Sequence, residues 1–293
     1  MLGLLTAAGL SPAARAQSSD AAALRTELER TYLNWLTAMR RSDVTAFAAH
    51  TSRYRQMCLR NEVVSLRQPW PSAVFRSVIQ APDLSRLTFV DATAVGDTAR
   101  AVYFGRVDFA LDIDVPVTPE NPLIVRFLKE GGVWKFDWIQ YVNLGPNEDA
   151  RRDARSGGRQ WLEAEEFRLT GRYPEIPKAC REPYQIAALS IRALGCRVTV
   201  DVNRGTHVET VENNHGGRVI TGGLQKGQNV VTITPVNLTS GSQAPDLEVS
   251  IVTRPETYRP SIKLWSWKPS HPAAQWQAKY DASFFVKSRA SAQ

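Results

Sequence analysis

Residues 131–138 read Gly-Gly-Val-Trp-Lys-Phe-Asp-Trp, and this stretch decides the fold that we expect for the N-terminal half of the chain. The glycine pair that follows Glu130 is typical of a tight hairpin turn. Alternating apolar and polar residues on either side predict two strands, at residues 123–130 and 133–142. The aromatic residues of the second strand alternate with other residues, which predicts one inner sheet face that carries Trp134, Phe136 and Trp138.

Upstream of this hairpin, the sequence predicts two more strands and, before them, helices. Period-two alternation indicates strands at residues 87–95 and 98–108. Three prolines within residues 115–122 indicate a loop, because proline cannot donate a hydrogen bond to a strand ladder. Apolar residues recur three and four positions apart over residues 20–41, which is typical of an amphipathic helix. Shorter helices are expected at residues 44–50 and 70–80.

The predicted helices carry Tyr32-Leu-Asn-Trp35, Ala38, Asp43 and Phe47. With the hairpin at 131–138 and the order of the elements, these residues make the segment 20–144 resemble the nuclear transport factor 2-like superfamily. This superfamily includes polyketide cyclases, ketosteroid isomerases and scytalone dehydratase. The resemblance implies an α+β cone, with helices on a curved antiparallel sheet around a pocket for a small apolar ligand. It also implies a homodimer that forms through the open sheet face.

The catalytic residues of these enzymes have no full match in the chain. Ketosteroid isomerases place a tyrosine eight residues before the aspartate that ends the first helix, and Trp35 stands at that position relative to Asp43. The stretch 57–61, where the general base would be expected, contains no aspartate. His50 is expected at a helix end, in solvent or as a cap. Whether the chain is an enzyme therefore stays open.

The pocket of the cone would be lined by nine side chains, according to their positions on the predicted elements: Tyr32, Trp35, Tyr54, Trp70, Arg106, Asp108, Arg126, Trp138 and Tyr141. Arg106 and Asp108 share one face of a strand, and a structural salt bridge between them is the first interpretation. Recognition of a ligand carboxylate or hydroxyl by a guanidinium group, or a catalytic role, are the alternatives.

Short alternating segments separated by glycine turns dominate the C-terminal half. They predict strands that build an all-β sandwich, at residues 185–194, 196–202, 218–221, 229–235 and 246–252. The stretches 198–205 and 223–229 resemble turns of jelly-roll and immunoglobulin-like accessory domains. The expected fold class is thus an α+β cone followed by an all-β sandwich. Its domains are expected at residues 17–145 and 183–293, with a linker at 146–182.

Three groups of residues in the C-terminal half leave two interpretations open. The predicted loop with His207 and His215 is either polar surface or a metal site beside Glu209 and Glu212. Trp265 and Trp267 either pack at a domain interface or stack on sugar rings. The cysteines that flank one predicted strand form a disulfide or stay buried free thiols, namely Cys180 and Cys196. No cofactor motif is found, and neither a cofactor nor a metal is expected.

The N-terminus and the charge indicate a compartment and a set of partners. Residues 2–10 are apolar, and Ala14-Arg15-Ala16 fits a signal-peptidase site, so residues 1–16 are expected to be a signal peptide; an Ala-rich tail is the alternative. An exported protein would be periplasmic or extracellular.

Most of the net charge of +7 lies in residues 183–293, which hold 12 basic and 7 acidic side chains. This excess is spread over the surface and contains no nucleic-acid motif. No apolar run is long enough to span a membrane.

These observations predict an exported two-domain binding or scaffold protein, with a small-ligand pocket in the N-terminal cone. Its partner would be a small apolar ligand or a protein of the cell envelope. The first alternative is an enzyme of the cyclase, dehydratase or hydrolase type, which would use an Arg- and Asp-lined pocket. The second is a carbohydrate-binding accessory protein that acts through the β-sandwich.

Overall fold

The computed structural model describes residues 12–76, 82–106, 120–142, 144, 147–163, 165–239, 244–253 and 261–287. The chain divides into two compact units, each built from two separate segments. Unit 1 consists of Met1–Met57 and Val74–Pro177, and unit 2 of Cys58–Ala73 and Lys178–Gln293. The domain borders expected near residues 145 and 183 stay predictions. Among the described residues, no helix combines the length and the apolar composition that a transmembrane segment needs.

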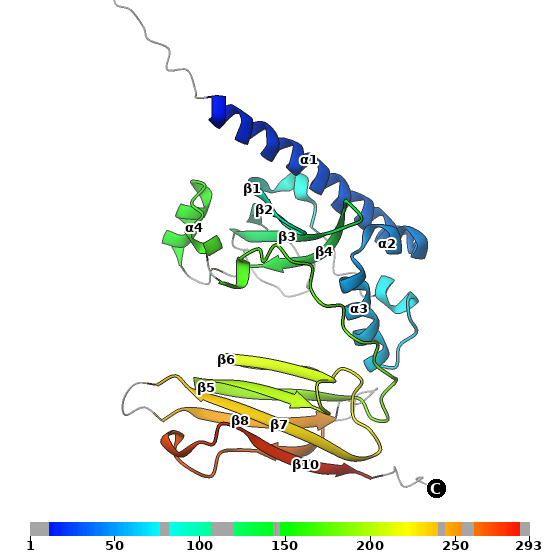
Figure 1. Cartoon of the computed structure of the whole chain (residues 1–293), viewed down its shortest axis with the longest axis vertical. Coiled ribbons are helices and arrows are strands. Elements are labelled where there is room, and N and C mark those ends of the chain that lie inside the picture. The colour runs from blue at the N-terminus through cyan, green and yellow to red at the C-terminus, as the bar shows by residue number, and fades with distance from the viewer. Residues whose placement is uncertain are drawn as a thin grey trace, which may run out of the picture. The chain divides into compact units, whose positions relative to one another are not determined.

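Three helices open the chain: α1 (Pro12–Arg41), α2 (Val44–His50) and α3 (Arg53–Ser65) (Figure 1). The chain leaves α1 at Ser42, whose positive φ of 52° cannot continue a helix. Asp43 then caps α2, because its Oδ1 accepts a hydrogen bond from Ala46 N at 2.9 Å. The helix predicted at 70–80 is only a short 3-10 turn, η1 (Ser72–Phe75), and residues 77–81 lie outside the described ranges.

Four antiparallel strands follow, in the order β1-β2-β3-β4: β1 (Thr88–Val95), β2 (Thr98–Arg106), β3 (Glu120–Glu130) and β4 (Val133–Tyr141). The predicted hairpin between β3 and β4 is confirmed, since Gly131 and Gly132 take positive φ angles of 57° and 83°. Strand β3 begins at Glu120 and includes Pro122, which had been assigned to a loop. Pro122 is tolerated there because its carbonyl still accepts a hydrogen bond from Val142 N.

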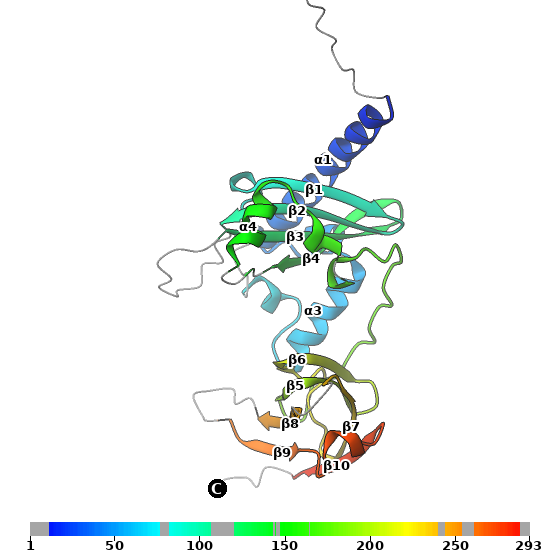
Figure 2. The same cartoon turned by 90° about the vertical axis from the view of Figure 1, so that its left-hand side faces the viewer.

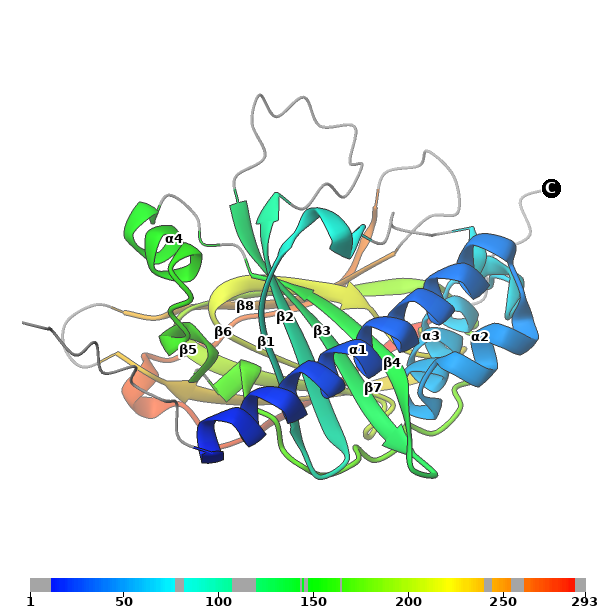
Figure 3. The ribbon, with the colours of Figure 1, turned by 90° about the horizontal axis from the view of Figure 1, so that it is seen from above.

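Different elements pack against the two faces of this sheet. Helix α1 lies across one face (Figure 3), where the side chains of Tyr32 and Trp35 pack against Phe136. On the other face, a smaller apolar cluster joins Val102 and Ile124 of the sheet to Leu162 and Phe167. The latter two come from the 3-10 turns η3 (Gln160–Glu163) and η4 (Glu165–Phe167), which follow helix α4 (Glu148–Arg155).

Unit 2 is a single sheet of six strands: β5 (Ala187–Val202), β6 (His207–Val219), β7 (Gly227–Asn237), β8 (Asp246–Thr253), β9 (Lys263–Trp267) and β10 (Tyr280–Val286). Strand β5 pairs with β6 along both of its halves, with β8 along its first half and with β7 along its second. Because a strand has only two edges, β7 and β8 share the edge opposite β6. The resulting sheet is close to a barrel.

The edge strands β9 and β10 are joined by aromatic rings and lie side by side in Figure 2. The Trp265 and Phe284 rings stack at 6.0 Å, and the Trp267 and Tyr280 rings lie 4.8 Å apart. Both tryptophans pack against the core of unit 2. We call these two ring pairs the aromatic seam. Packing inside unit 2 is thus the role that the structure shows for the two tryptophans.

The expected fold class, an α+β cone followed by an all-β sandwich, is wrong. The described chain is mostly β, with its helices concentrated in the N-terminal part, and it holds two antiparallel sheets. A sandwich needs two separate sheets, whereas β5 links all strands of unit 2 into one. The sequence had been divided into two strands at Gly195, but the chain continues through this glycine, at φ 68°, as one long strand.

The end of α3 belongs to unit 2 and is attached to it by buried polar side chains. Asn61 Nδ2 donates to Lys178 O at 2.8 Å, and Asn61 Oδ1 accepts from Cys180 N at 2.9 Å. Ser65 Oγ accepts from Gly222 N at 2.7 Å. Cys180 and Cys196 are both free thiols; Cys196 is buried, as the second interpretation expects, whereas Cys180 is only half-buried.

Candidate functional site

Eight of the nine predicted pocket residues lie within the described residues, and they have different surroundings. Tyr32 and Trp35 are buried between α1 and the sheet, where the Trp35 ring stacks on Phe136 with 3.7 Å between the ring centroids. Tyr32 Oη donates to Pro82 O at 2.8 Å, and burial raises the pKa of this phenol above its ordinary value. These rings fill the space that the cone was expected to leave open.

Of three further candidates, two lie within the described residues. Trp70 is half-buried in the segment that belongs to unit 2. Arg106 is exposed at the end of β2, and Asp108 lies outside the described residues, so their salt bridge stays a prediction.

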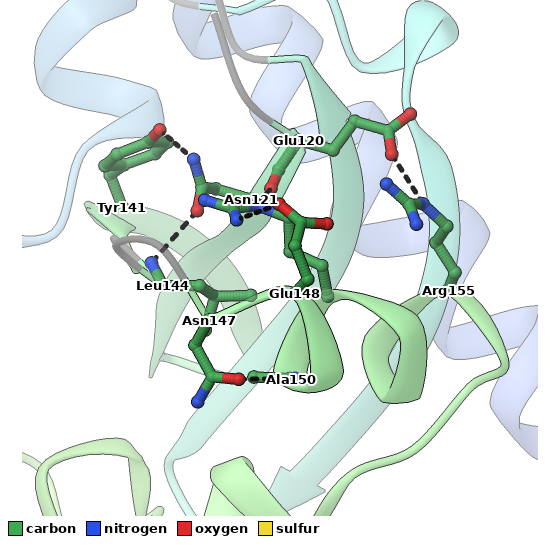
Figure 4. Close-up of polar contacts among 9 residues, drawn as sticks. Glu120, Asn121, Tyr141, Leu144, Asn147, Glu148, Ala150 and Arg155 are labelled. Atoms are coloured by element: carbon green, nitrogen blue, oxygen red, sulfur yellow. Dashed lines mark hydrogen bonds and ion pairs between the residues drawn. The ribbon is translucent and has the colours of Figure 1, made fainter.

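Tyr141 takes part in the polar cluster that fastens α4 to the start of β3 (Figure 4). Its hydroxyl accepts a hydrogen bond from the buried Asn121 Nδ2, and burial raises its pKa. Arg155 Nε lies 2.7 Å from Glu120 Oε2, and the buried Arg151 donates to Glu120 O and to Glu148. The contacts drawn in Figure 4 are hydrogen bonds and ion pairs between residues of the cluster itself. We therefore interpret this cluster as structural.

Two of the remaining candidates, Arg126 and Trp138, pair with each other next to a β-bulge in β4. Arg126 pairs with Trp138, but the next pair is Phe127 with Phe136, so Asp137 is one extra residue in the strand. The bulge breaks the predicted alternation of aromatic residues. Trp134 and Phe136 are buried, with exposed fractions of 5% and 4%, whereas Trp138 is 45% exposed. The prediction of one face shared by all three rings is therefore wrong.

Asp137 itself is held in a partly apolar environment. Ser52 Oγ donates a hydrogen bond to Asp137 Oδ1 at 2.7 Å. Burial raises the pKa of the Asp137 carboxyl, while the Ser52 hydrogen bond and the charges of Arg55 and Arg126 act in the opposite direction. A carboxyl group with a raised pKa beside two guanidinium groups is a common feature of functional sites.

The charges of Arg55 and Arg126 act on Asp137, and these two arginines in turn contact Trp138 and Gln140. We call the five residues together the bulge site: Arg55, Arg126, Asp137, Trp138 and Gln140. Arg126 Nη2 donates to Gln140 Oε1 at 3.0 Å. The guanidinium carbon of Arg55 lies 4.1 Å from the centre of the Trp138 ring, in a cation–π contact. The site thus combines two positive side chains, one carboxyl group and a partly exposed indole ring.

The start of α3 is fixed beside this site by a second network. Arg53 N donates to Glu130 Oε1 at 2.7 Å, and Tyr173 Oη donates to the same oxygen at 2.5 Å. Tyr54 N donates to Tyr173 Oη at 3.1 Å. Burial, followed by Glu130, raises the pKa of Tyr173 to about 12. This network fixes the first turn of α3, which also carries Arg55.

Sequence reasoning found only part of the bulge site. It named Arg126 and Trp138, and it named Tyr54 from the neighbouring network. It missed Asp137, which regular alternation places on the face opposite the aromatic residues, and Arg55, which reaches β4 only through tertiary packing; it did not single out Gln140. The one local signal for the bulge is the polar residue between two aromatic ones in Phe136-Asp137-Trp138. This signal does not distinguish a bulge, because regular strands show the same alternation.

The histidines were one candidate for a metal site. Within the described ranges, no three His, Cys, Asp or Glu side chains are grouped so as to hold a metal ion. The predicted polar loop around His207 and His215 is wrong, since both residues belong to strand β6. Thr221 N donates to Nδ1 of the buried His207 at 3.3 Å, and burial lowers the pKa of this imidazole. Burial also lowers the pKa of the half-buried His50.

We expect His207 to make the chain less stable in acid. Its pKa is below the ordinary value of 6.5 in the folded state, so below about pH 6.5 the unfolded chain binds a proton that the folded chain excludes. The free energy of unfolding should therefore fall as the pH drops through 6.5. In His207→Asn, whose amide oxygen replaces Nδ1 as acceptor, this part of the pH dependence should disappear. Urea denaturation between pH 5 and 8 measures it, with the exposed His215→Asn as control; an unchanged profile in His207→Asn contradicts the prediction.

Comparison of the chain with protein-family models, with curated proteins and with solved structures finds no match. The function is therefore argued from the bulge site alone.

Proposed function

We propose that the chain is a binding protein that holds a small ligand at the bulge site of unit 1. The observation that carries this proposal is the position of Trp138, a large aromatic side chain that is 45% exposed beside two arginines and a partly buried carboxyl group. Exposed tryptophan next to arginine is enriched where proteins bind partners, because both side chains offer a large contact area and directed hydrogen bonds.

The bulge site favours a ligand with a flat apolar part and a polar end. The exposed part of the Trp138 indole would pack against the flat part. Arg126 and Gln140 would direct hydrogen bonds to the polar end, since a guanidinium group presents its N–H donors in one plane. Arg55, already stacked on the indole, would hold the ring in place.

One observation favours an enzyme as the second candidate. A carboxyl group with a raised pKa, as at Asp137, suits a general acid or base. The Arg106 and Asp108 pair of the enzyme hypothesis stays a prediction. Conversion of a bound ligand by the purified protein would decide for the enzyme. A carbohydrate-binding role is not favoured, because Trp265 and Trp267 belong to the aromatic seam.

The wider setting of this proposal comes from the sequence. We propose an exported protein, periplasmic or extracellular, whose signal peptide would be residues 1–16; these residues lie outside the described ranges, except for the helical backbone from Pro12. Membership of the nuclear transport factor 2-like superfamily and dimerisation through the N-terminal sheet also stay proposals. Secretion of a tagged full-length chain and its mass in solution would test them.

We expect Trp138→Ala to weaken ligand binding about tenfold or more, because the ligand loses its main apolar contact. A thermal-shift screen of flat neutral, anionic and cationic molecules would find ligands, and calorimetry would measure their affinity. The control is Val133→Ala, since Val133 is also exposed on β4 but lies at the hairpin end of the strand. Equal affinity of wild type and Trp138→Ala for every ligand found, or no ligand in the screen, would contradict the proposed function.

A further inference from the structure

We propose that His207 is a pH switch of unit 2: protonation of its imidazole ring opens the turn at residues 220–223 and releases the end of α3 from that turn. The groups involved all belong to unit 2. The inference is therefore independent of the bulge site and goes beyond the proposed function, which does not use this buried histidine.

The first step is the way in which the imidazole ring is held. His207 is the first residue of β6 and is 6% exposed. Its Nδ1 accepts a hydrogen bond from Thr221 N at 3.3 Å, and Thr221 Oγ1 lies at the same distance. A neutral imidazole accepts at one nitrogen and donates at the other, so Nε2 carries the hydrogen. In the part of the chain that the structure describes, Nε2 is buried and has no hydrogen-bond partner. The ring is thus held through the nitrogen that acid protonates.

The second step is the link from this turn to α3. Gly222 N donates to Oγ of Ser65, the last residue of α3, at 2.7 Å. The Ser65 side chain is 1% exposed. The N–H groups of Thr221 and Gly222 belong to consecutive peptide groups, whose relative orientation depends only on the two rotations at Thr221. A change in the first hydrogen bond therefore also reorients the donor of the second.

Protonation removes the acceptor on which this arrangement depends. An imidazolium ring donates at both nitrogens, so Nδ1 would then face Thr221 N as a donor facing a donor. The Thr221 hydroxyl can turn and accept from the ring, but its backbone N–H cannot. A charge on the buried ring also carries a desolvation cost. Opening the turn brings the ring into water and removes these costs, so acid favours the open turn.

The charged groups around His207 do not offset this cost. Burial has the largest effect and, with Arg218 of β6, lowers the pKa of the imidazole below its ordinary value of 6.5, while Asp201 of β5 acts in the opposite direction. Arg218 lies 3.5 Å from Glu209 of the same strand. The turn at 220–223 contributes no charged residue. The closed turn therefore favours the neutral ring, and the open turn favours the charged one.

Buried anchors on either side of the turn confine the opening. Ile220 and Leu224 are both 0% exposed. Ile220 N donates to Ala187 O and Leu224 N donates to Gln185 O, both at 2.9 Å. The two residues that follow Ile220 are only half-buried. We therefore expect the turn to open while the sheet beside it stays paired.

Amide hydrogen exchange of the full-length protein, followed by NMR between pH 8 and pH 5, tests the switch. Protection factors, corrected for the intrinsic exchange rate at each pH, should fall at Thr221 N and Gly222 N by up to about tenfold per pH unit below pH 6.5. Low concentrations of urea should not accelerate exchange at these two amides, because a local opening exposes little surface, but should accelerate it at Leu224 N. Constant protection at Thr221 N, or equal acceleration by urea at all three amides, would overturn the proposal.

Two variants separate the parts of the proposal. His207→Asn keeps a neutral acceptor, so the protection of Thr221 N should no longer depend on pH, and the exposed His215→Asn on the same strand is the matched control. A pH dependence that remains in His207→Asn would overturn the role of this residue. Ser65→Ala should lower the protection of Gly222 N at pH 8 about tenfold, because this amide loses its acceptor. Unchanged protection there would overturn the link to α3.

The half-buried thiol of Cys180 reports the release of α3. It donates to Asn61 O at 3.5 Å and lies 3.7 Å from Ser65 Oγ. Its reaction with dithiodipyridine, located by peptide mass spectrometry, is compared between wild type and His207→Asn at the same pH, so that the effect of acid on the thiol itself cancels. The ratio of the two rates should be close to one at pH 8 and about threefold or more at pH 5.5. A ratio of one at both pH values would overturn the release of α3.

Discussion

Replacing Phe136 with alanine is expected to lower the free energy of unfolding by about 3–5 kcal/mol, the cost of truncating a buried phenylalanine. The Phe136 ring is 4% exposed and stacks on Trp35 with 3.7 Å between centroids. It also contacts the Tyr32 ring at 6.1 Å. Truncation removes these contacts and leaves a cavity between α1 and β4, which the bulky neighbours cannot close.

Urea denaturation followed by circular dichroism would measure this change. Phe136→Leu should cost less, about 1–2 kcal/mol, because it keeps most of the apolar volume. The matched control is Val133→Ala on the same strand, where an exposed side chain should change stability by under about 0.5 kcal/mol. A loss below about 1 kcal/mol in Phe136→Ala would show that the ring stack does not hold α1 on the sheet.

Replacing Asn229 with alanine is expected to destabilise unit 2 by about 1–3 kcal/mol, since partly buried polar groups lose their partners. The Asn229 side chain is fully buried at the start of β7. Its Oδ1 accepts from Asn203 Nδ2 at 3.0 Å and from Gln225 N at 2.9 Å. Its Nδ2 donates to Gln225 O at 2.9 Å and to Gly227 O at 3.2 Å. Alanine would leave these groups without their hydrogen bonds inside the unit.

The neighbouring residue provides the control for this variant. Gln228 is exposed on the same strand, so Gln228→Ala should leave the denaturation midpoint almost unchanged. The prediction is measured by urea denaturation followed by tryptophan fluorescence, to which two rings of the aromatic seam contribute among the eight tryptophans of the chain. Equal midpoints for Asn229→Ala and Gln228→Ala would contradict it.

These two residues also show how far the sequence could predict the fold. The hairpin beside Phe136 and the turns at Asn203 and Asn229 follow from local patterns, and the structure contains them. The hydrogen bond between Asn203 and Asn229 was not predictable, because nothing local relates two turns that are distant in the chain. The single sheet of unit 2 was missed for a similar reason. Gly195 breaks the pattern of β5, and the pairing with β6 is irregular there, but pairing on both sides of the glycine makes the two halves one strand.

Only some residues of the bulge site could be predicted from the sequence. Arg126 and Trp138 were predicted because strand parity brings them to one face, and the structure pairs them across β3 and β4. One extra residue then turns Trp138 outward and places Asp137 beside it. A bulge adds one residue to a strand without changing the kinds of residue in it, so the alternating sequence pattern did not indicate the bulge. The contacts of Arg55 and Ser52 with this strand depend on tertiary packing, which no local pattern encodes.

The attachment of α3 to unit 2 has a consequence for synthesis of the chain on the ribosome. Asn61 and Ser65 emerge early, but their partners Lys178, Cys180 and Gly222 come much later. Domains fold as units, generally from the N-terminus during translation. Unit 2 therefore cannot form its buried polar attachment until most of the chain has been made. Until then, the second half of α3 exposes two polar side chains that the finished protein buries.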